Sequence, residues 1–147
     1  MPYEFRVRRR VEFSETDMAG IVHYSNFFRY MEAAEHAFFR SLGTSIVMDQ
    51  NEPKLGWPRV HAQCDYMAPL RFEDEIEIQM LIAEKKSKAL TYLFRIWKVN
   101  SNPPVESARG KITVVCVSRG EDGQMKSHQI PKSFADQIEV APADLLG

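Results

Sequence analysis

The chain has 147 residues, 44% of them apolar and 27% charged, and a formal net charge of -1 at pH 7. This length and composition predict a soluble globular protein with one domain, residues 1–147, and lack the basic excess that nucleic-acid-binding proteins normally show. The sequence has no run of about 18 apolar residues and no apolar signal region at its start, so we expect neither a membrane span nor export.

The first predicted element is a strand over residues 3–13, where apolar and polar side chains alternate. Alternation with a period of two is typical of a strand that buries one of its faces. Only Arg9 interrupts the apolar face. We therefore expect this segment to enter a sheet with one buried side.

A loop separates this strand from a helix that is predicted over residues 26–42 and ends at Gly43. Ser25 or Asn26 can cap its first turn. Its polar residues recur at helical spacing in one narrow stripe, and the rest of its circumference is apolar. Such a helix is expected to be buried on most sides.

Strands dominate the remainder of the chain, after an irregular stretch at residues 44–57. The alternating segments cover residues 59–66, 75–82, 90–96 and 108–118. A lysine-rich turn at residues 84–88 joins two of them, and Asn-Pro-Pro at residues 102–104 breaks the chain before the last. Residues 131–138 can form a short terminal helix.

The order of these elements predicts the fold class. One long helix near the start is followed by four strands without intervening helices, which indicates an α+β protein with an antiparallel sheet. The order β-α-β-β-β-β is that of the hotdog fold, in which the sheet wraps around one long central helix.

The segment between the first strand and the helix combines three features that suit acyl chemistry. Asp17 is an isolated carboxylate, Gly20 permits a tight loop, and the helix begins near Tyr24. A helix N-terminus presents unsatisfied N–H groups that can polarise a carbonyl oxygen. We therefore expect a carboxylate that attacks, or directs water at, a polarised carbonyl; the alternative is that Asp17 is an ordinary turn residue.

Residues 17–27, Asp-Met-Ala-Gly-Ile-Val-His-Tyr-Ser-Asn-Phe, resemble the active-site loop of the 4-hydroxybenzoyl-CoA thioesterase family of hotdog proteins. Residues 66–70 followed by 73–76 resemble that family's second and third strands, and residues 130–131 resemble its closing segment. The resemblance covers most of the chain. It implies an acyl-CoA thioesterase whose subunits pair their sheets and share active sites, as a homodimer or homotetramer.

The resemblance also implies roles for individual residues. Asp17 is the catalytic carboxylate, either as a nucleophile that forms an acyl-enzyme anhydride or as a general base that aligns water. The backbone N–H of Tyr24 binds the thioester carbonyl, and Gly20 lets the loop approach closely. One branch of the family has tyrosine before histidine at positions 23 and 24, with a catalytic histidine; this chain has the reverse order, so His23 does not inherit that role.

Further residues are candidates for substrate binding. Glu32 matches a substrate-contacting acid of the family, with a solvated helix face as an equal alternative. Phe27 and Trp57 can wall an apolar acyl pocket, although aromatic residues at such positions are more often core. Lys86 and Lys88 match a basic turn of the family and are candidates to contact coenzyme A phosphates, with a solvated hairpin tip as the alternative.

The two cysteines, Cys64 and Cys116, lie far apart and lack the spacing of metal ligands. Each falls in an apolar alternation, which predicts free buried thiols in a reducing cytoplasm and no bound metal.

The leading hypothesis is hydrolysis of an acyl-CoA thioester to a free acid and coenzyme A, without a metal or redox cofactor. A non-catalytic module that binds acyl-CoA or acyl carrier protein is the alternative from another class. A hotdog dehydratase is a third, but such enzymes typically pair a histidine with an acid, and no matching motif occurs here. The sequence leaves open the acyl group, the choice between coenzyme A and carrier protein, and the choice between dimer and tetramer.

Overall fold

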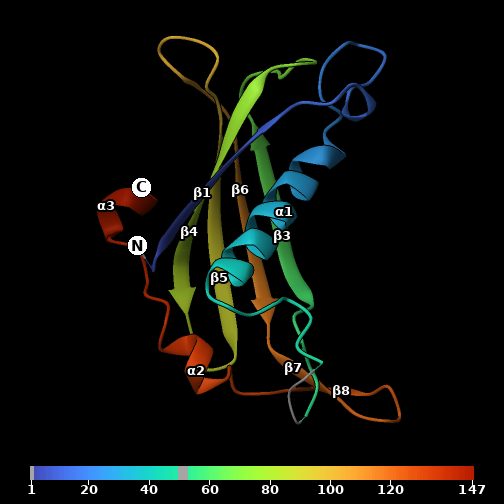
Figure 1. The fold of residues 1–147 in the computed structure, drawn as a ribbon, viewed down its shortest axis with the longest axis vertical. Helices are drawn as coiled ribbons and strands as arrows, with labels where there is room; N and C mark the ends of the chain where they lie inside the picture. Colours follow the sequence, from blue (N-terminus) through green and yellow to red (C-terminus); the bar gives the residue numbers. More distant parts are fainter. Residues whose placement is uncertain (1, 50–52) are drawn as a thin grey trace.

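The computed structural model describes residues 2–49 and 53–147, and its largest element is a five-stranded sheet in the order β1-β4-β5-β6-β3 (Figure 1). The strands are β1 (Glu4–Arg10), β3 (Arg59–Tyr66), β4 (Glu75–Lys85), β5 (Ala89–Lys98) and β6 (Val105–Val115). All neighbouring strands in this sheet run antiparallel. The predicted α+β class with an antiparallel sheet is confirmed.

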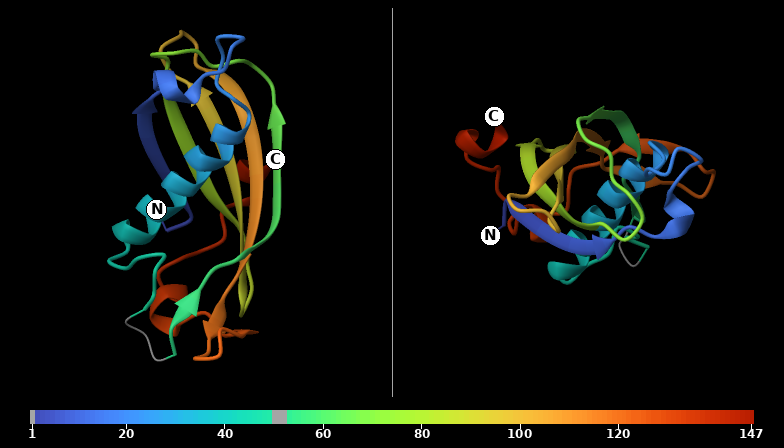
Figure 2. Two further views of the ribbon diagram at one scale, coloured as in Figure 1. Left: turned by 90° about the vertical axis from the view of Figure 1, so that its right-hand side faces the viewer. Right: turned by 90° about the horizontal axis from the view of Figure 1, so that it is seen from above.

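Helix α1 (Ser25–Ser41) packs against one face of this sheet, which curves around it (Figure 2). The alternation of β5 places Leu90, Tyr92, Phe94 and Ile96 on the buried side. Gly110 in β6 allows the helix to come close, because a Cβ atom at this position would lie 2.2 Å from the terminal methyl of Met31. The helix and the central strands therefore form one core.

The helix has the 17 residues predicted for it, shifted by one position, but it is short beside the strands and less buried than predicted. Its 17 residues span about 25 Å, which is shorter than the roughly 36 Å of the 11-residue strands β4 and β6. It is also not buried on most sides, because Arg29, Glu32, Ala33 and Arg40 are exposed. The narrow polar stripe read from the sequence is in fact one edge of a broader solvent face.

A smaller sheet at the lower end of the molecule in Figure 1 and short helices complete the fold. The small sheet contains β2 (Leu55–Gly56), β7 (Val117–Arg119) and β8 (Met125–Ser127), and the short helices are η1 (Phe13–Glu15), α2 (Lys132–Ala135) and α3 (Ala143–Leu146). The predicted last strand is thus split between β6 and β7, and the predicted terminal helix is only α2. The sequence analysis missed β8 and α3.

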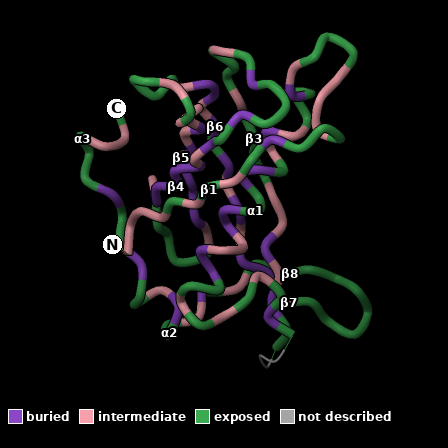
Figure 3. Tube along the Cα trace, turned by 45° about the horizontal axis from the view of Figure 1, so that its top comes forward, coloured by how far each residue is buried: buried purple, intermediate pink, exposed green. Residues whose placement is uncertain are grey.

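Strands β1 and β3 are the two edges of the main sheet. Figure 3 marks buried residues along α1 and the central strands, and exposed residues in the surrounding loops. Along β3, residues 60–63, 65 and 66 are exposed, so both faces of this edge strand are open to solvent. Cys64 is only half-buried, whereas Cys116 is buried; both are free thiols.

The C-terminal segment covers part of the face that points away from α1. The backbone N–H of Ala141 donates to the carbonyl of Ile82 at 2.8 Å, and Arg95 Nη2 donates to the carbonyl of Gly147 at 2.7 Å. Leu81, on the outer side of β4, is fully buried. None of the helices in the described part of the chain has the length and hydropathy needed to cross a bilayer.

Candidate active site

The loop that carries Asp17 is a tight turn between β1 and α1. The Asp17 backbone N–H donates to the carbonyl of Ile21, and the Gly20 N–H donates to the carbonyl of Asp17, both at 2.9 Å. Gly20 has φ +81°, a left-handed conformation in which a side chain would be strained. The Asp17 Oδ1 atom accepts the Ala19 N–H at 2.8 Å, so the side chain both supports its own turn and stays partly exposed.

The helix that follows begins without a side-chain cap, contrary to the prediction that Ser25 or Asn26 would supply one. The Ser25 hydroxyl is bonded to His23 Nδ1 at 2.8 Å, and Asn26 Nδ2 donates to the carbonyl of Glu15 at 2.8 Å. Both candidate caps are thus engaged elsewhere. Within the described residues, the backbone N–H of Tyr24 has no hydrogen-bond acceptor. A donor at the positive end of a helix is therefore free to bind an oxygen.

Asp17, Tyr24 and Phe27 line one cavity of about 550 Å³. Its walls come from the loop, the first turn of α1, the end of β3 and the segment after it. The other lining residues are Ile21, Val22, Tyr66, Met67, Ala68, Pro69 and Leu70. The cavity is largely apolar, with the Asp17 carboxylate at its rim, and its volume suits a small ligand group.

Tyr66 fixes the helix N-terminus to the end of β3. Its O–H donates to the carbonyl of Tyr24 at 3.1 Å, and its ring meets that of Phe27 edge-on at 5.1 Å between centroids. Partial desolvation of the phenol, with a smaller effect of the neighbouring Cys64 thiol, raises the pKa of Tyr66 to about 12. The phenol therefore remains a hydrogen-bond donor throughout the neutral range.

A second hollow lies on the other side of Asp17. It has a volume of about 550 Å³ and is lined by Phe13, Ser14, Thr16, Asp17, Met18, Gly20 and Phe72. Phe13 and Phe72 meet edge-on at 5.7 Å and form its apolar wall. Asp17 is thus accessible from two sides of the loop.

His23 lies outside both hollows. Its ring stacks on that of Tyr24 at 4.5 Å between centroids, and its Nδ1 atom is bonded to the Ser25 hydroxyl. His23 therefore helps to hold the turn and does not line the cavity.

Two predicted substrate-binding residues lie away from the Asp17 cavity. Trp57 is buried in the core, where its ring packs edge-on against Phe39 and at an angle against Phe134. Glu32 is exposed on α1 and reaches toward Arg59 with a closest distance of 3.7 Å. Neither residue lines the cavity, because Trp57 faces the far half of α1 and Glu32 faces solvent.

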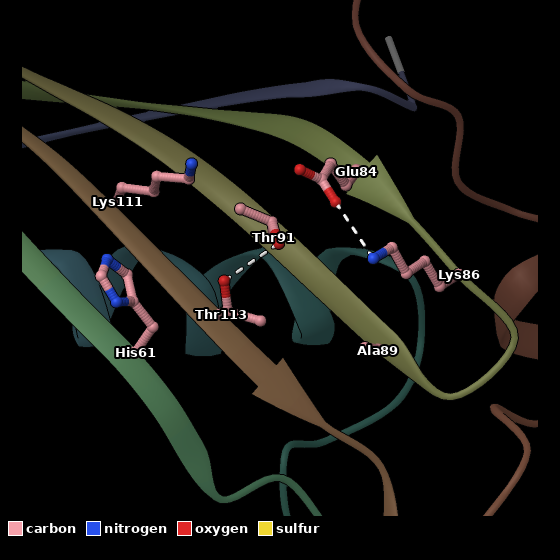
Figure 4. A pocket seen from close by; sticks show the side chains of 7 residues that line it. All are labelled: His61, Glu84, Lys86, Ala89, Thr91, Lys111 and Thr113. Carbon is pink, nitrogen blue, oxygen red and sulfur yellow. Dashed lines mark hydrogen bonds and ion pairs between the residues drawn. The ribbon is translucent and has the colours of Figure 1, made fainter.

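The basic turn with Lys86 and Lys88 joins β4 to β5 at the opposite end of the sheet from the Asp17 loop (Figure 1). Lys86 is 3.7 Å from Glu84 and lines a hollow of about 260 Å³ on the sheet face turned away from α1 (Figure 4). Lys88 is exposed in the same turn. Within one subunit, these lysines and Asp17 therefore do not share a cavity.

Sequence reasoning missed a buried ion pair behind the site. Glu35 on α1 is only 1% exposed, and both oxygens of its carboxylate accept from the Arg59 guanidinium at the start of β3. The signal was present, because Glu35 lies between Ala34 and Phe38 on the buried side of the helix. A charged residue at such a position requires a partner.

It also missed the contacts that hold the loop itself. Arg9, noted as an interruption of an apolar strand face, pairs with the carboxylate of Glu15 and lies 4.7 Å above the ring of Tyr30.

Within the described residues, no group of three or more His, Cys, Asp or Glu side chains is arranged to hold a metal ion.

Comparisons with known proteins agree on one family. The family model described as the thioesterase-like superfamily matches residues 11–138. A solved hypothetical protein from Aquifex aeolicus is 31% identical, with a TM-score of 0.80 over 92% of this chain and 99% of that one. A solved gentisyl-coenzyme A thioesterase is 30% identical, with a TM-score of 0.77 over 92% of this chain and 100% of that one. The 4-hydroxybenzoyl-CoA thioesterase of Pseudomonas sp. (strain CBS-3) is 23% identical over 146 residues, or 95% of this chain and 99% of the relative.

Proposed function

The chain belongs to the thioesterase-like superfamily, and from this premise we propose that it hydrolyses an acyl-CoA thioester with Asp17 as the catalytic carboxylate. The observation that carries the proposal is the convergence of Asp17 and the uncapped start of α1 at Tyr24 on one apolar cavity. A non-catalytic acyl-CoA binder has no need of a carboxylate beside a free helix N–H. Residues 1–147 act in this proposal as one hotdog domain.

The chemistry follows from what these groups can do. The thioester carbonyl oxygen accepts the Tyr24 N–H, which stabilises the negative charge that develops on this oxygen. The Asp17 carboxylate either attacks the carbonyl carbon, expelling the coenzyme A thiolate and leaving an anhydride that water cleaves, or takes a proton from the water that attacks. Both routes give a free acid and coenzyme A, and neither requires a metal or redox cofactor.

An aromatic acyl group suits the cavity best. Phe27 and Tyr66 present aromatic surfaces to it, and the cavity is large enough for one or two rings. Two of the relatives described above are named for hydroxylated aromatic acyl groups. Aliphatic acyl groups form the comparison arm of the test.

We further propose a homodimer in which the β3 edges of two copies pair. Val60 and Tyr66 are exposed on β3, and an open sheet edge is a template for strand pairing. A two-fold axis makes this pairing antiparallel, so the Arg59 end of one β3 lies beside the Tyr66 end of the other. The basic turn of each copy then approaches the cavity of the other, where Lys86 and Lys88 can contact coenzyme A phosphates.

The free thiols Cys64 and Cys116 support a reducing, cytoplasmic location in this proposal. Burial raises the pKa of the Cys116 thiol to about 11, so this thiol stays protonated near neutral pH and is a poor nucleophile.

The decisive experiment is thiol release from a panel of aromatic and aliphatic acyl-CoAs, with wild type beside Asp17→Asn. We expect the wild type to cleave an aromatic class and the variant to lose turnover while still binding the substrate. Binding of acyl-CoA without cleavage by the wild type would instead indicate a ligand-binding module.

A second experiment tests the basic turn. Replacing Lys86 and Lys88 with alanine is expected to raise KM for the coenzyme A ester more than for a truncated pantetheine thioester. An equal change for the two substrates would show that these lysines do not contact the phosphates.

The proposed homodimer is tested separately by light scattering. A protein that was only monomeric would contradict the site shared between subunits.

A further inference from the structure

We propose that Glu15 is a positioning residue, which holds the Asp17 loop in register with the start of α1 so that the carboxylate and the Tyr24 N–H face one substrate. The inference rests on the proposed function of Asp17 and extends it to a residue that no resemblance or comparison assigns. It requires that Glu15 join the strand, the loop and the helix directly, and that its contacts serve the geometry of the loop.

The carboxylate of Glu15 joins the strand to the helix. It forms an ion pair with Arg9 of β1 and accepts the phenolic O–H of Tyr30 of α1 at 3.0 Å. It also accepts the backbone N–H of Glu12 at 2.8 Å, which fixes the turn that leads into the loop. The side chain is only 17% exposed, and its bonds to Arg9 and Tyr30 are partly shielded from water.

The backbone carbonyl of Glu15 joins the two ends of the loop. It accepts the N–H of His23 at 2.9 Å and Asn26 Nδ2 at 2.8 Å. The next residue, Thr16, forms a bridge with Val22. The pairs Glu15–His23 and Thr16–Val22 therefore close the base of the loop. Asp17 follows the first segment of this base, and Tyr24 follows the second.

The partners of the carboxylate are themselves held rigidly. Arg9 points inward from β1 and packs over the ring of Tyr30 at 4.7 Å. Tyr30 is fully buried, and burial together with the hydrogen bond to Glu15 raises the pKa of its phenol well above the usual value. Arg9 is only partly buried, with a side chain that is 31% exposed, and in the described residues Glu15 is the carboxylate that pairs with it.

The opposite face of β1 supplies a matched control. Glu77 accepts from Arg6 at 2.7 Å and from Arg8 at 2.9 Å, so it too pairs with arginines of β1. This cluster contacts no residue of the Asp17 loop. Glu77→Gln, in β4, and Glu15→Gln, in η1, therefore each remove one carboxylate charge that pairs with arginines of β1, and only the second change reaches the loop.

The test is kcat and KM for a cleaved acyl-CoA in Glu15→Gln, Tyr30→Phe and Glu77→Gln. We expect Glu15→Gln to lower kcat about 10- to 100-fold with little change in KM, because a loop displaced by an ångström misaligns the reacting groups. Tyr30→Phe removes only one hydroxyl and should lower kcat less. Glu77→Gln should keep wild-type kcat.

A double-mutant cycle in kcat tests whether Arg9 acts through Glu15. If Arg9 acts through Glu15, Arg9→Gln and Glu15→Gln together should lower kcat no more than the larger single change. Equal losses of kcat in Glu15→Gln and Glu77→Gln would overturn the inference, as would a lower melting temperature with unchanged kcat.

Amide hydrogen exchange keeps the inference testable apart from the proposed function. Exchange at residues 17–24 should accelerate in Glu15→Gln and not in Glu77→Gln, whether or not any acyl-CoA is cleaved. If wild type cleaves no thioester but this exchange difference is seen, the proposed function fails and the positioning of the loop stands. Unchanged exchange in both variants would refute the positioning role.

Discussion

The two ends of helix α1 are built in opposite ways. At the C-terminal end, the N–H of Gly43 donates to the carbonyl of Arg40, the N–H of Thr44 donates to that of Phe39, and the Ser41 hydroxyl donates to that of Phe38. At the N-terminal end neither Ser25 nor Asn26 caps the helix. His23 Nδ1 accepts the Ser25 N–H at 3.2 Å, whereas the Tyr24 N–H has no acceptor within the described residues. One end of the helix is thus closed for stability, and the other is left open where a substrate oxygen can bind.

The carboxylates near the two ends of the helix also differ, in their burial and in their hydrogen-bond partners. Glu35, in the second half of the helix, is buried and bound through both oxygens by Arg59. Asp17, beside the first turn, is partly exposed, and among the described residues its side chain accepts only a backbone N–H of its own turn. A carboxylate that is already neutralised by an arginine cannot attack, whereas one that is lightly bonded at a cavity rim can.

The largest effect that we predict is on Asp17. Asp17→Asn should lower turnover by roughly 10²–10⁴-fold, because it removes the nucleophile or base while keeping the shape of the turn. The melting temperature should stay near the wild-type value. Steady-state kinetics beside a thermal melt would check both, and a variant with wild-type turnover would place the chemistry elsewhere.

Glu35→Gln should show the reverse pattern. Breaking this ion pair removes the buried partner of Arg59 and leaves it, among the carboxylates of the described residues, only the exposed Glu32, 3.7 Å away, so the free energy of unfolding should fall by about 3 kcal/mol. Turnover per folded molecule should change little. The control is Glu32→Gln, because Glu32 approaches the same arginine from solvent and should contribute less than about 1 kcal/mol. Urea unfolding would measure the difference, and equal losses would mean that burial does not set the strength of the pair.

Gly20 and Gly43 allow the sharpest comparison, because both have φ +81° and open space where a Cβ would sit. Alanine at either position should introduce about 1 kcal/mol of backbone strain. At Gly43 the strain should lower only the free energy of unfolding. At Gly20 it should distort the catalytic turn and lower kcat as well. Loss of kcat in Gly43→Ala would show that the two ends of the helix are coupled.

The smallest effect is expected for Tyr66→Phe, which removes the hydrogen bond to the Tyr24 carbonyl. A loss of about 1 kcal/mol corresponds to several-fold in kcat. The pKa of Tyr66 is raised to about 12, so the phenol stays protonated and the bond is lost only as the pH rises toward that value. The ratio of wild-type to variant kcat should therefore be constant between pH 6 and pH 9, and a ratio that falls across this range would contradict the assignment.

Local patterns were sufficient to predict most of the fold. The period-two alternation of the strands and the glycine after the helix depend on residues that are neighbours in sequence. The same holds for the turn at Gly20, whose φ is positive as the loop requires. The placement of Asp17, Tyr24 and Phe27 on one cavity follows, because all three lie within 11 residues of one another.

Contacts between distant segments could not be predicted in this way. Nothing near Tyr66 indicates that its hydroxyl reaches Tyr24, and nothing near Trp57 indicates that its ring packs against Phe134 in the C-terminal segment. Such pairs are set by the curvature of the sheet around the helix, which a single sequence does not record.

The unequal edges of the main sheet limit how far it can extend. Strand β1 is only seven residues long and carries four arginines, which discourage another strand from joining that side. Its neighbour β4 continues past β1, and there the carbonyl of Ile82 is taken up by the N–H of Ala141. In the main sheet, β3 is therefore the edge that favours strand addition. Pairing of two β3 edges would use up this edge in both copies and end the growth, whereas a sheet with two such edges would be able to extend into a fibre.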